Sequence, residues 1–339
     1  MKAIVLEGPG KVAVKEVEEP VAKSGDDVLL SVRYVGLCGS DLNSYRGKNP
    51  LVSFPRILGH EVSAVVAETN HRHPEWPAGT PVTLSPYNHC GVCASCRRER
   101  YNACKDNLTM GVMRDGAMCE RVYVPASRLF SAKLSLKELC LVEPLTVGFH
   151  SAARGSVEPD ETAAVIGCGG VGLGAVAGAA YRGARVIAID VDDRKLATAK
   201  KAGAVEGIHS GRENVHERLA AMTAGLGPDV VIEAIGLPDT YRMAVSEAAF
   251  TGRVIYIGYA KEPVCYETKF FVQKELDIRG SRNALPEDFR AVMKFLEAGT
   301  FPVEDAVTHI VPLEQVPEIL DEWNREPAKF SKIMVEVSR

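Results

Sequence analysis

The segment between residues 163 and 190 restricts the possible folds of this chain more than any other. It begins with the apolar run AAVI, continues through GCGGVG, and ends with RVIAID, whose last residue is Asp190. A G-x-G-x-x-G pattern between a strand and a helix, followed by an acidic residue about 20 positions on, is typical of a βαβ unit that binds a dinucleotide. We therefore predict that the cofactor contacts Gly167, Gly169, Gly170, Val171 and Gly172.

Each glycine of this pattern has a separate predicted role. Gly167 permits the tight turn, Gly169 lets the backbone approach a pyrophosphate at the helix N-terminus, and Gly172 lets helix and strand pack closely. The carboxylate of Asp190 accepts hydrogen bonds from the adenosine ribose and repels a 2′-phosphate, so it favours NAD over NADP. The neighbouring Arg194 weakens that preference slightly. The alternative is a domain of the same fold that binds no nucleotide.

Apolar strand-like runs alternate with helix-like segments over the whole middle of the chain. From residue 161 to about 280, the runs AAVIG, RVIAID, DVVIEAIG and RVIYIGY alternate with helix-like segments. This alternation predicts a doubly wound parallel sheet of α/β class. The first third differs, because it contains short strands such as 27–38 and 61–68, and a hairpin signal at Gly8-Pro9-Gly10.

Composition excludes several classes of function. The chain of 339 residues is 46% hydrophobic and 25% charged, with a formal net charge of −4. These values are typical of a globular protein and argue against bulk attraction to nucleic acid. Glu7 interrupts the apolar core that a secretory signal needs, so we expect a cytoplasmic protein. The uncharged run 162–181 has the length of a membrane span, but a buried strand followed by a buried helix explains it better.

A cluster of cysteines indicates a metal site. The chain has nine cysteines, an odd number, which argues against a disulfide framework. Four of them fall in CGVCASCRRERYNAC, where Cys-x-x-Cys turns suit a tetrahedral ion. We predict that a structural zinc is held by Cys90, Cys93, Cys96 and Cys104. The alternative is four free thiols in a mobile loop.

A second set of metal-binding residue types lies in three separate motifs. These motifs are GLCGSDLNSYRG (36–47), LGHE (58–61) and VEPLTVGFHSAARG (142–155). Cys38 and His60 are good zinc ligands, and Glu61 and Glu143 are candidate oxygen ligands. A catalytic zinc has three protein ligands and an open position. We expect Asp41 to accept the other ring proton of His60.

These motifs occur in an order that resembles the zinc-dependent medium-chain dehydrogenases over essentially the whole chain. Glu143, where classical alcohol dehydrogenases carry a cysteine, favours the polyol, sorbitol and threonine dehydrogenase branch. YRGKNP, FPRILGHE and GSRNALPEDF resemble bacterial sugar-acid dehydrogenases of the L-galactonate 5-dehydrogenase kind. The resemblance implies two zincs per chain, a mostly-β GroES-like catalytic domain (1–145 and 284–339) and a Rossmann NAD-binding domain (146–283).

The resemblance also implies roles for single residues. Cys38, His60 and Glu143 match the catalytic zinc ligands, and Glu61 matches a carboxylate that exchanges with water near the metal. Ser40 matches a hydroxyl that contacts the substrate oxygen. The cofactor residues that the resemblance adds are Lys195, which pairs with Asp190 on the ribose, and Lys332, near the pyrophosphate. Asn43 stands where the family often has a proton-relay histidine.

We therefore expect an NAD-dependent oxidoreductase that acts on a secondary alcohol of a small polyhydroxy substrate. A sugar acid needs a cation for its carboxylate, and the candidates are Arg46, Arg114 and Arg282. For each of these arginines, solvation at the surface is the alternative. The competing functions are an L-threonine 3-dehydrogenase, a sorbitol-type polyol dehydrogenase, or a non-catalytic NAD-binding regulator. The family implies a homodimer or homotetramer.

Overall fold

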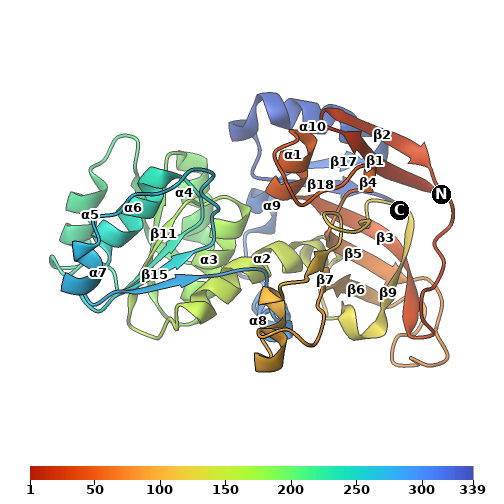
Figure 1. Cartoon of the computed structure of the whole chain (residues 1–339), viewed down its shortest axis with the longest axis horizontal. Helices are drawn as coiled ribbons and strands as arrows, with labels where there is room; N and C mark the ends of the chain where they lie inside the picture. The colour runs from red at the N-terminus through yellow and green to blue at the C-terminus, as the bar shows by residue number, and fades with distance from the viewer. Residues whose placement is uncertain (339) are drawn as a thin grey trace. The chain divides into compact units, whose positions relative to one another are not determined.

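The computed structural model describes residues 1–338, which form two compact units (Figure 1). One unit contains Met1–Glu143 together with the chain from Val303 onward, and the other contains Pro144–Pro302. No helix within residues 1–338 has the length and apolar character needed to cross a membrane.

Antiparallel sheets dominate the first unit. Its largest sheet has the order β10-β6-β5-β3-β18-β17, and β9 also pairs with β3. These strands are β3 (Asp27–Leu37), β5 (Glu61–Val66), β6 (Pro81–Leu84), β9 (Arg121–Pro125), β10 (Leu129–Phe130), β17 (Val307–Pro312) and β18 (Lys332–Glu336). β18 therefore inserts between β3 and β17, so the last strand of the chain completes a sheet that the first third begins.

Two small sheets and three helices complete this unit. The smaller strands are β1 (Lys2–Gly8), β2 (Lys11–Glu16), β4 (Arg56–Ile57), β7 (Tyr87–Asn88) and β8 (Leu108–Thr109). β1 and β2 pair antiparallel, which confirms the predicted hairpin. The helices are α1 (Gly39–Tyr45), α9 (Val303–Ala306) and α10 (Val316–Arg325). α10 packs on the sheet core through Val316, Ile319 and Leu320, which share one helix face.

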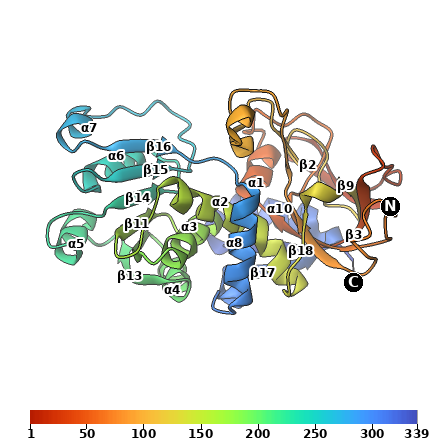
Figure 2. The same ribbon diagram turned by 90° about the horizontal axis from the view of Figure 1, so that it is seen from below.

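The second unit is a doubly wound sheet, as predicted (Figure 2). Its six strands have the order β13-β12-β11-β14-β15-β16, and every pairing is parallel. The strands are β11 (Thr162–Ile166), β12 (Arg185–Asp190), β13 (Ala204–His209), β14 (Val230–Glu233), β15 (Arg253–Tyr256) and β16 (Asp277–Gly280). The helices between them are α3 (Gly170–Tyr181), α4 (Asp193–Lys201), α5 (Val215–Met222), α6 (Pro238–Glu247) and α7 (Lys269–Gln273).

Two helices lie near the boundaries of the units. α2 (Leu136–Arg154) spans the first boundary, and α8 (Pro286–Glu297) falls in the second unit, although we expected residues from 284 onward to belong to the catalytic domain. Asp288 of α8 is buried, with Oδ2 at 2.8 Å from His150 Nδ1 of α2 and at 2.8 Å from the Leu285 N–H. This contact joins α8 to α2 within the second unit.

Candidate metal and dinucleotide sites

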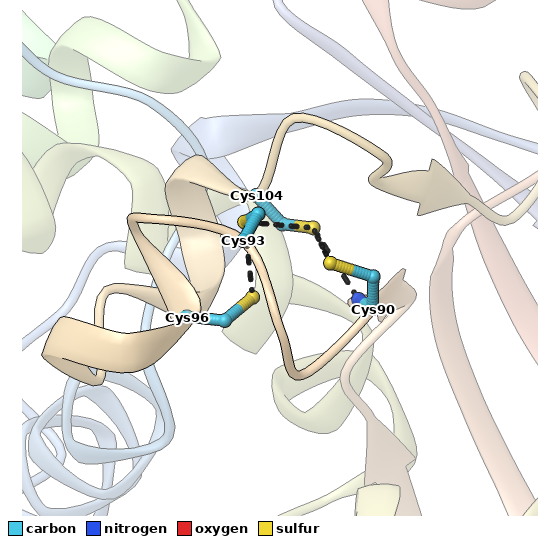
Figure 3. Close-up of side chains that lie close together, drawn as sticks. All are labelled: Cys90, Cys93, Cys96 and Cys104. Atoms are coloured by element: carbon cyan, nitrogen blue, oxygen red, sulfur yellow. Dashed lines mark hydrogen bonds between the residues drawn. The ribbon is translucent and has the colours of Figure 1, made fainter.

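The four clustered cysteines converge on one point (Figure 3). Their sulfur atoms all lie within 4.8 Å of one another, and none is in a disulfide. The Sγ–Sγ distances are 3.5 Å for Cys93–Cys96, 3.8 Å for Cys93–Cys104 and 3.6 Å for Cys90–Cys104. A tetrahedron with Zn–S bonds of about 2.3 Å has edges of about 3.8 Å. The four thiols therefore fit a tetrahedral zinc, and nothing else is needed to complete its coordination.

The loop between β7 and β8 sets both the position and the ionisation of these cysteines through local contacts. Gly91 adopts a left-handed φ of 77°, which lets the chain turn sharply after the first cysteine. The Ser95 hydroxyl and backbone N–H groups lower the pKa of Cys93 to about 5. A thiol that ionises this readily is suited to bind a metal as thiolate.

A second donor set forms at the meeting of β3, α1 and β5. Cys38 follows β3, His60 and Glu61 stand at the start of β5, and their ligand atoms all lie within 4.8 Å of one another. β3 and β5 are antiparallel with Gly36 opposite Glu61. A Cβ at Gly36 would lie 2.0 Å from Glu61 Oε2, so this glycine makes room for the carboxylate.

Buried acids outnumber buried cations around this set. His60, Glu61, Asp41 and Glu143 are at most 5% exposed. Burial raises the pKa of Asp41, and it raises the pKa of Glu143 to about 7. Burial alone would lower the pKa of His60, but Cys38 and the nearby carboxylates raise it well above its usual value. A site that favours a positive charge so strongly, with imidazole, thiol and carboxylate donors, fits a divalent zinc.

The expected contact between Asp41 and His60 is not formed. Asp41 Oδ2 instead accepts the backbone N–H of Cys38 at 2.9 Å, because Asp41 lies in the first turn of α1. Neither Asp41 Oδ1 nor His60 Nδ1 has a hydrogen-bond partner within residues 1–338. Asp41 therefore positions the backbone of a ligand residue rather than the imidazole ring.

Tyr87 is a member of this site that the sequence analysis missed. Its hydroxyl donates to Glu143 Oε1, and Tyr87 is itself buried. Glu143 lies outside the 4.8 Å set formed by the other three donors. The role of Glu143 as a ligand stays a prediction, and Tyr87 is the side chain that orients its carboxylate.

Lys332 also has an unexpected position. Its Nζ donates to both carboxylate oxygens of Glu61 at 2.7 Å and lies 3.3 Å from the Leu37 carbonyl oxygen. Burial opposes the charge, but Glu61 and Cys38 raise the pKa of Lys332 above its usual value. The structure thus places the ammonium group on Glu61, while its predicted contact with a pyrophosphate stays a prediction.

The other residues predicted to contact the substrate, which are Ser40 and three arginines, lie in different environments. The hydroxyl of Ser40, in α1, is buried and has no partner among the described residues. Arg46 is held by Asn324, with Nε at 2.7 Å from Oδ1 and Nη2 at 3.0 Å from the backbone oxygen. Within residues 1–338, the hydrogen bonds of the Arg114 guanidinium go to the carbonyl oxygens of Leu108 and Pro86, and Arg282 is half-buried in the second unit. The guanidinium of Arg46 is thus bound to α10, and the substrate roles of all three arginines stay predictions.

The glycine loop of the second unit has the predicted form. Gly167 has a φ of 92°, and a Cβ there would lie 2.4 Å from Ile235 Cγ1. A Cβ at Gly172 would lie 1.7 Å from the Gly167 carbonyl oxygen. A Cβ at Gly169 would meet only open space. Two glycines thus serve packing, while Gly169, at the start of α3, leaves room for a ligand to reach the backbone. Direct contacts with Gly170 and Val171 stay predictions.

Asp190 at the end of β12 fixes the backbone around this loop. Its Oδ2 accepts the N–H of Cys168 at 2.7 Å, and its Oδ1 accepts the N–H groups of Val191 and Asp192 at 2.7 and 3.1 Å. Asp192 in turn caps α4 by accepting the N–H groups of Arg194 and Lys195. The cofactor roles of Asp190, Arg194 and Lys195 stay predictions.

We expect Asp190→Ala to reduce the preference for NAD over NADP by roughly tenfold or more, because it removes a charged hydrogen-bond partner and the repulsion of a 2′-phosphate. Steady-state kinetics with both cofactors measure the effect, and zinc content should stay unchanged. Asp190→Asn keeps the shape of the side chain and removes its charge. This variant therefore separates the repulsion of the 2′-phosphate from the loss of the hydrogen bonds that Asp190 accepts from backbone N–H groups. A wild-type protein that prefers NADP would contradict the assignment.

Comparisons with known proteins identify the family of the chain. Residues 24–134 match the alcohol dehydrogenase GroES-like domain, and residues 170–298 match the zinc-binding dehydrogenase domain. A zinc-type alcohol dehydrogenase-like protein of Haemophilus influenzae is 34% identical, with 98% of each chain covered. Sorbitol dehydrogenase of Bacillus subtilis is 31% identical, covering 100% of this chain and 98% of the relative. L-Galactonate-5-dehydrogenase of Escherichia coli is 28% identical, with 94% of each covered.

Solved structures give the same result for the fold. An alcohol dehydrogenase of Escherichia coli CFT073 complexed with NADH has a TM-score of 0.89 at 27% identity, with 99% of each chain covered. A zinc-binding dehydrogenase of Sinorhizobium meliloti 1021 bound to NADP has a TM-score of 0.92 at 28% identity, with 99% of each chain covered. The predicted combination of a GroES-like domain and a Rossmann sheet is confirmed.

Proposed function

Because the chain belongs to the family of zinc-dependent medium-chain dehydrogenases, we propose that it oxidises a secondary alcohol of a sugar acid or polyol with NAD. The proposed reaction is of the L-galactonate or L-gluconate 5-dehydrogenase kind. The observation that carries it is the donor set of Cys38, which is half-buried, with the buried His60 and Glu61, together with the Ser40 hydroxyl, which is buried and has no hydrogen-bond partner within residues 1–338. A polar hydroxyl without a partner in a buried site is costly, and a substrate hydroxyl satisfies it.

In this proposal Cys38, His60 and Glu143 hold the catalytic zinc. When bound, zinc supplies a Lewis acid for the hydroxyl oxygen of the substrate. Tyr87 fixes the carboxylate of Glu143, and Asp41 fixes the backbone of Cys38. Contacts of this kind around metal ligands commonly support affinity and geometry.

The proton of the substrate hydroxyl leaves through Ser40. Both oxygens of Glu61 already accept from Lys332, and Asn43 carries no titratable group. Ser40 Oγ has free hydrogen-bonding capacity, so it can accept this proton and pass one to water. When bound, NAD would supply the acceptor for the hydride of the alcohol carbon, and the product would be a ketone.

The experiment that tests this function is an assay of NADH formation by the zinc-loaded chain with L-galactonate, L-gluconate, sorbitol and L-threonine. We expect the highest kcat/KM with a polyhydroxy compound. Turnover of L-threonine alone would favour a threonine dehydrogenase, for which the family also has members. NAD binding without turnover of any compound would favour the regulator and overturn the proposal. Cytoplasmic localisation and a dimeric or tetrameric state are parts of the proposal.

We expect Ser40→Ala to lower kcat by about a hundredfold or more, since a positioned proton-transfer group contributes roughly that factor. NAD affinity and zinc content should stay close to their wild-type values, because in this proposal the serine hydroxyl contacts neither the NAD molecule nor the zinc ion. Ser246→Ala removes an exposed hydroxyl of α6 and serves as the matched control. A Ser40→Ala enzyme with wild-type kcat would place the proton path elsewhere.

A further inference from the structure

Glu233 is a buried acidic residue of the second unit that has no role in the sites described above. It is the last residue of β14, and its side chain is fully buried. One carboxyl oxygen, Oε1, accepts the N–H groups of Ile235 and Gly236 at 2.9 and 2.8 Å, and it also accepts the Thr240 hydroxyl at 2.8 Å. The side chain therefore turns back on the loop that follows its own strand and fixes that loop to the first turn of α6.

The loop of residues 234–237 lies beside the glycine loop. A Cβ at Gly167 would lie 2.4 Å from Ile235 Cγ1, so the two loops are in close contact. The Ala234 N–H donates to the Ile166 carbonyl oxygen at 2.9 Å, which joins the end of β14 to the end of β11. A shift of the loop of residues 234–237 would therefore change the surroundings of the glycine loop.

The order of the strands places this loop where such a sheet binds its ligand. The chain passes from β11 to β12 and β13 on one side, and then returns to β14, β15 and β16 on the other side of β11. In open parallel sheets, ligands bind outside the carboxyl ends of the strands, at the point where the strand order reverses. That point lies between β11, which the glycine loop follows, and β14, which the loop of residues 234–237 follows. Both loops therefore border the place where a dinucleotide binds.

The burial of Glu233 has a cost. Its second carboxyl oxygen, Oε2, is buried and has no hydrogen-bond partner within residues 1–338. A Cβ at Gly258, in the loop after β15, would lie 2.7 Å from this oxygen, so the absence of a side chain there leaves room for it. Burying an acidic group with one oxygen unpartnered is unfavourable, so the position calls for a role that outweighs this cost.

We propose that Glu233 is a positioning residue for the dinucleotide: through Oε1 it holds the loop of residues 234–237 in the conformation that NAD needs. The reach of the side chain is the decisive property, because three donors from this loop and from α6 converge on a single oxygen. The inference goes beyond the proposed function, since it holds for any alcohol that the chain oxidises.

Three variants separate the reach of this side chain from its acidity. Glu233→Gln keeps the length and an acceptor oxygen, Glu233→Asp keeps the acid but is shorter by a methylene group, and Glu233→Ala removes both. Glu206→Ala is the control, because Glu206 of β13 accepts the backbone N–H of Gly207 in the same sheet. The measurement is the Kd of NADH from fluorescence titration of the full chain, which needs no alcohol substrate.

We expect Glu233→Asp and Glu233→Ala to raise the Kd of NADH by roughly tenfold or more, because the lost hydrogen bonds to an acidic group have effects of this size. Glu233→Gln and Glu206→Ala should stay within about threefold of the wild type, since the first keeps the acceptor and the second alters a different strand. With saturating NAD and an alcohol that the wild type oxidises, kcat should change by less than about threefold in every variant, as expected when cofactor binding alone is weakened.

Melting temperature and zinc content show whether each variant is folded. If Glu233→Ala does not fold, the contrast between Glu233→Gln and Glu233→Asp decides the question by itself. An unchanged Kd in Glu233→Asp, an equal loss of affinity in Glu233→Gln and Glu233→Asp, or a kcat that falls as much as the affinity would overturn the proposal. A chain that binds NADH in the expected pattern but oxidises no alcohol would support the role of Glu233 and overturn only the proposed function.

Discussion

Replacing Cys38 by alanine is expected to reduce turnover by at least about a thousandfold. The substitution removes the thiol from the donor set that it forms with the buried His60 and Glu61. Loss of a Lewis acid at the reacting oxygen costs several kcal/mol of transition-state stabilisation, and about 1.4 kcal/mol corresponds to a tenfold change in rate. Elemental analysis should find one zinc per chain instead of two, and kcat should fall with it.

The control for this variant is Cys265→Ala, which alters an exposed cysteine outside both clusters. NAD affinity, measured by quenching of protein fluorescence, should be similar in the wild type and both variants, because the glycine loop belongs to the second unit. A Cys38→Ala protein that keeps two zincs and full activity would show that these residues do not form the catalytic centre.

Replacing Cys96 by serine is expected to destabilise the folded chain more than any other single change considered. Structural zinc sites contribute about 10–16 kcal/mol in small zinc-binding peptides, which is comparable to the whole stability of a typical protein. The core of the loop that contains Cys96 is a small hydrophobic cluster, in which, among residues 1–338, Tyr101 is the one side chain besides the cysteines. We expect the melting temperature to fall by about 10 °C or more.

Differential scanning calorimetry with parallel zinc analysis measures this effect. Cys265→Ser is the matched control, since it makes the same chemical change at an exposed position. A chelator should reproduce the loss of stability in the wild type and have a smaller effect on Cys96→Ser. A Cys96→Ser protein that melts at the wild-type temperature would mean that the four thiols do not hold a structural ion.

The parts of the metal and dinucleotide sites that lie within one short segment of the chain could be predicted from the sequence. The glycine loop, the four-cysteine loop and the pair His60-Glu61 are short segments in which residue type and spacing determine the geometry. Cys38 was identified because thiols and imidazoles are good zinc ligands, and because its motif and the others occur in the order found in the zinc-dependent medium-chain dehydrogenases. The structure brings the four cysteines of the loop together and groups Cys38 with His60 and Glu61, whereas the predicted ligand Glu143 lies outside that group.

The contacts that were missed join residues far apart in the chain. Lys332 and Glu61 are 271 positions apart, and they meet because β18 inserts beside β3, which pairs with β5. Tyr87 and Glu143 are 56 positions apart, and the tyrosine hydroxyl reaches the carboxylate from β7, which precedes the cysteine loop. A pattern within a short segment of sequence cannot predict contacts between residues so far apart.

One expectation about a single side chain failed for a local reason. Asp41 was expected to support His60, but in the first turn of α1 a carboxylate reaches the free backbone N–H groups more easily than a distant ring. The nearby backbone therefore competes successfully for this side chain. Arg46 donates two hydrogen bonds to Asn324 at the end of α10, and its role in binding a carboxylate stays a prediction.

The central claim is that this chain transfers hydride from a polyhydroxy alcohol to NAD only when the donor set around Cys38 and His60 holds zinc. The most direct measurement is NADH formation as a function of zinc content in one preparation, partly depleted with a chelator and then reloaded. We predict that activity disappears with loss of one of two zincs, while the fold persists, and returns in proportion when that zinc is restored. Full turnover of a preparation that contains no zinc would contradict the account.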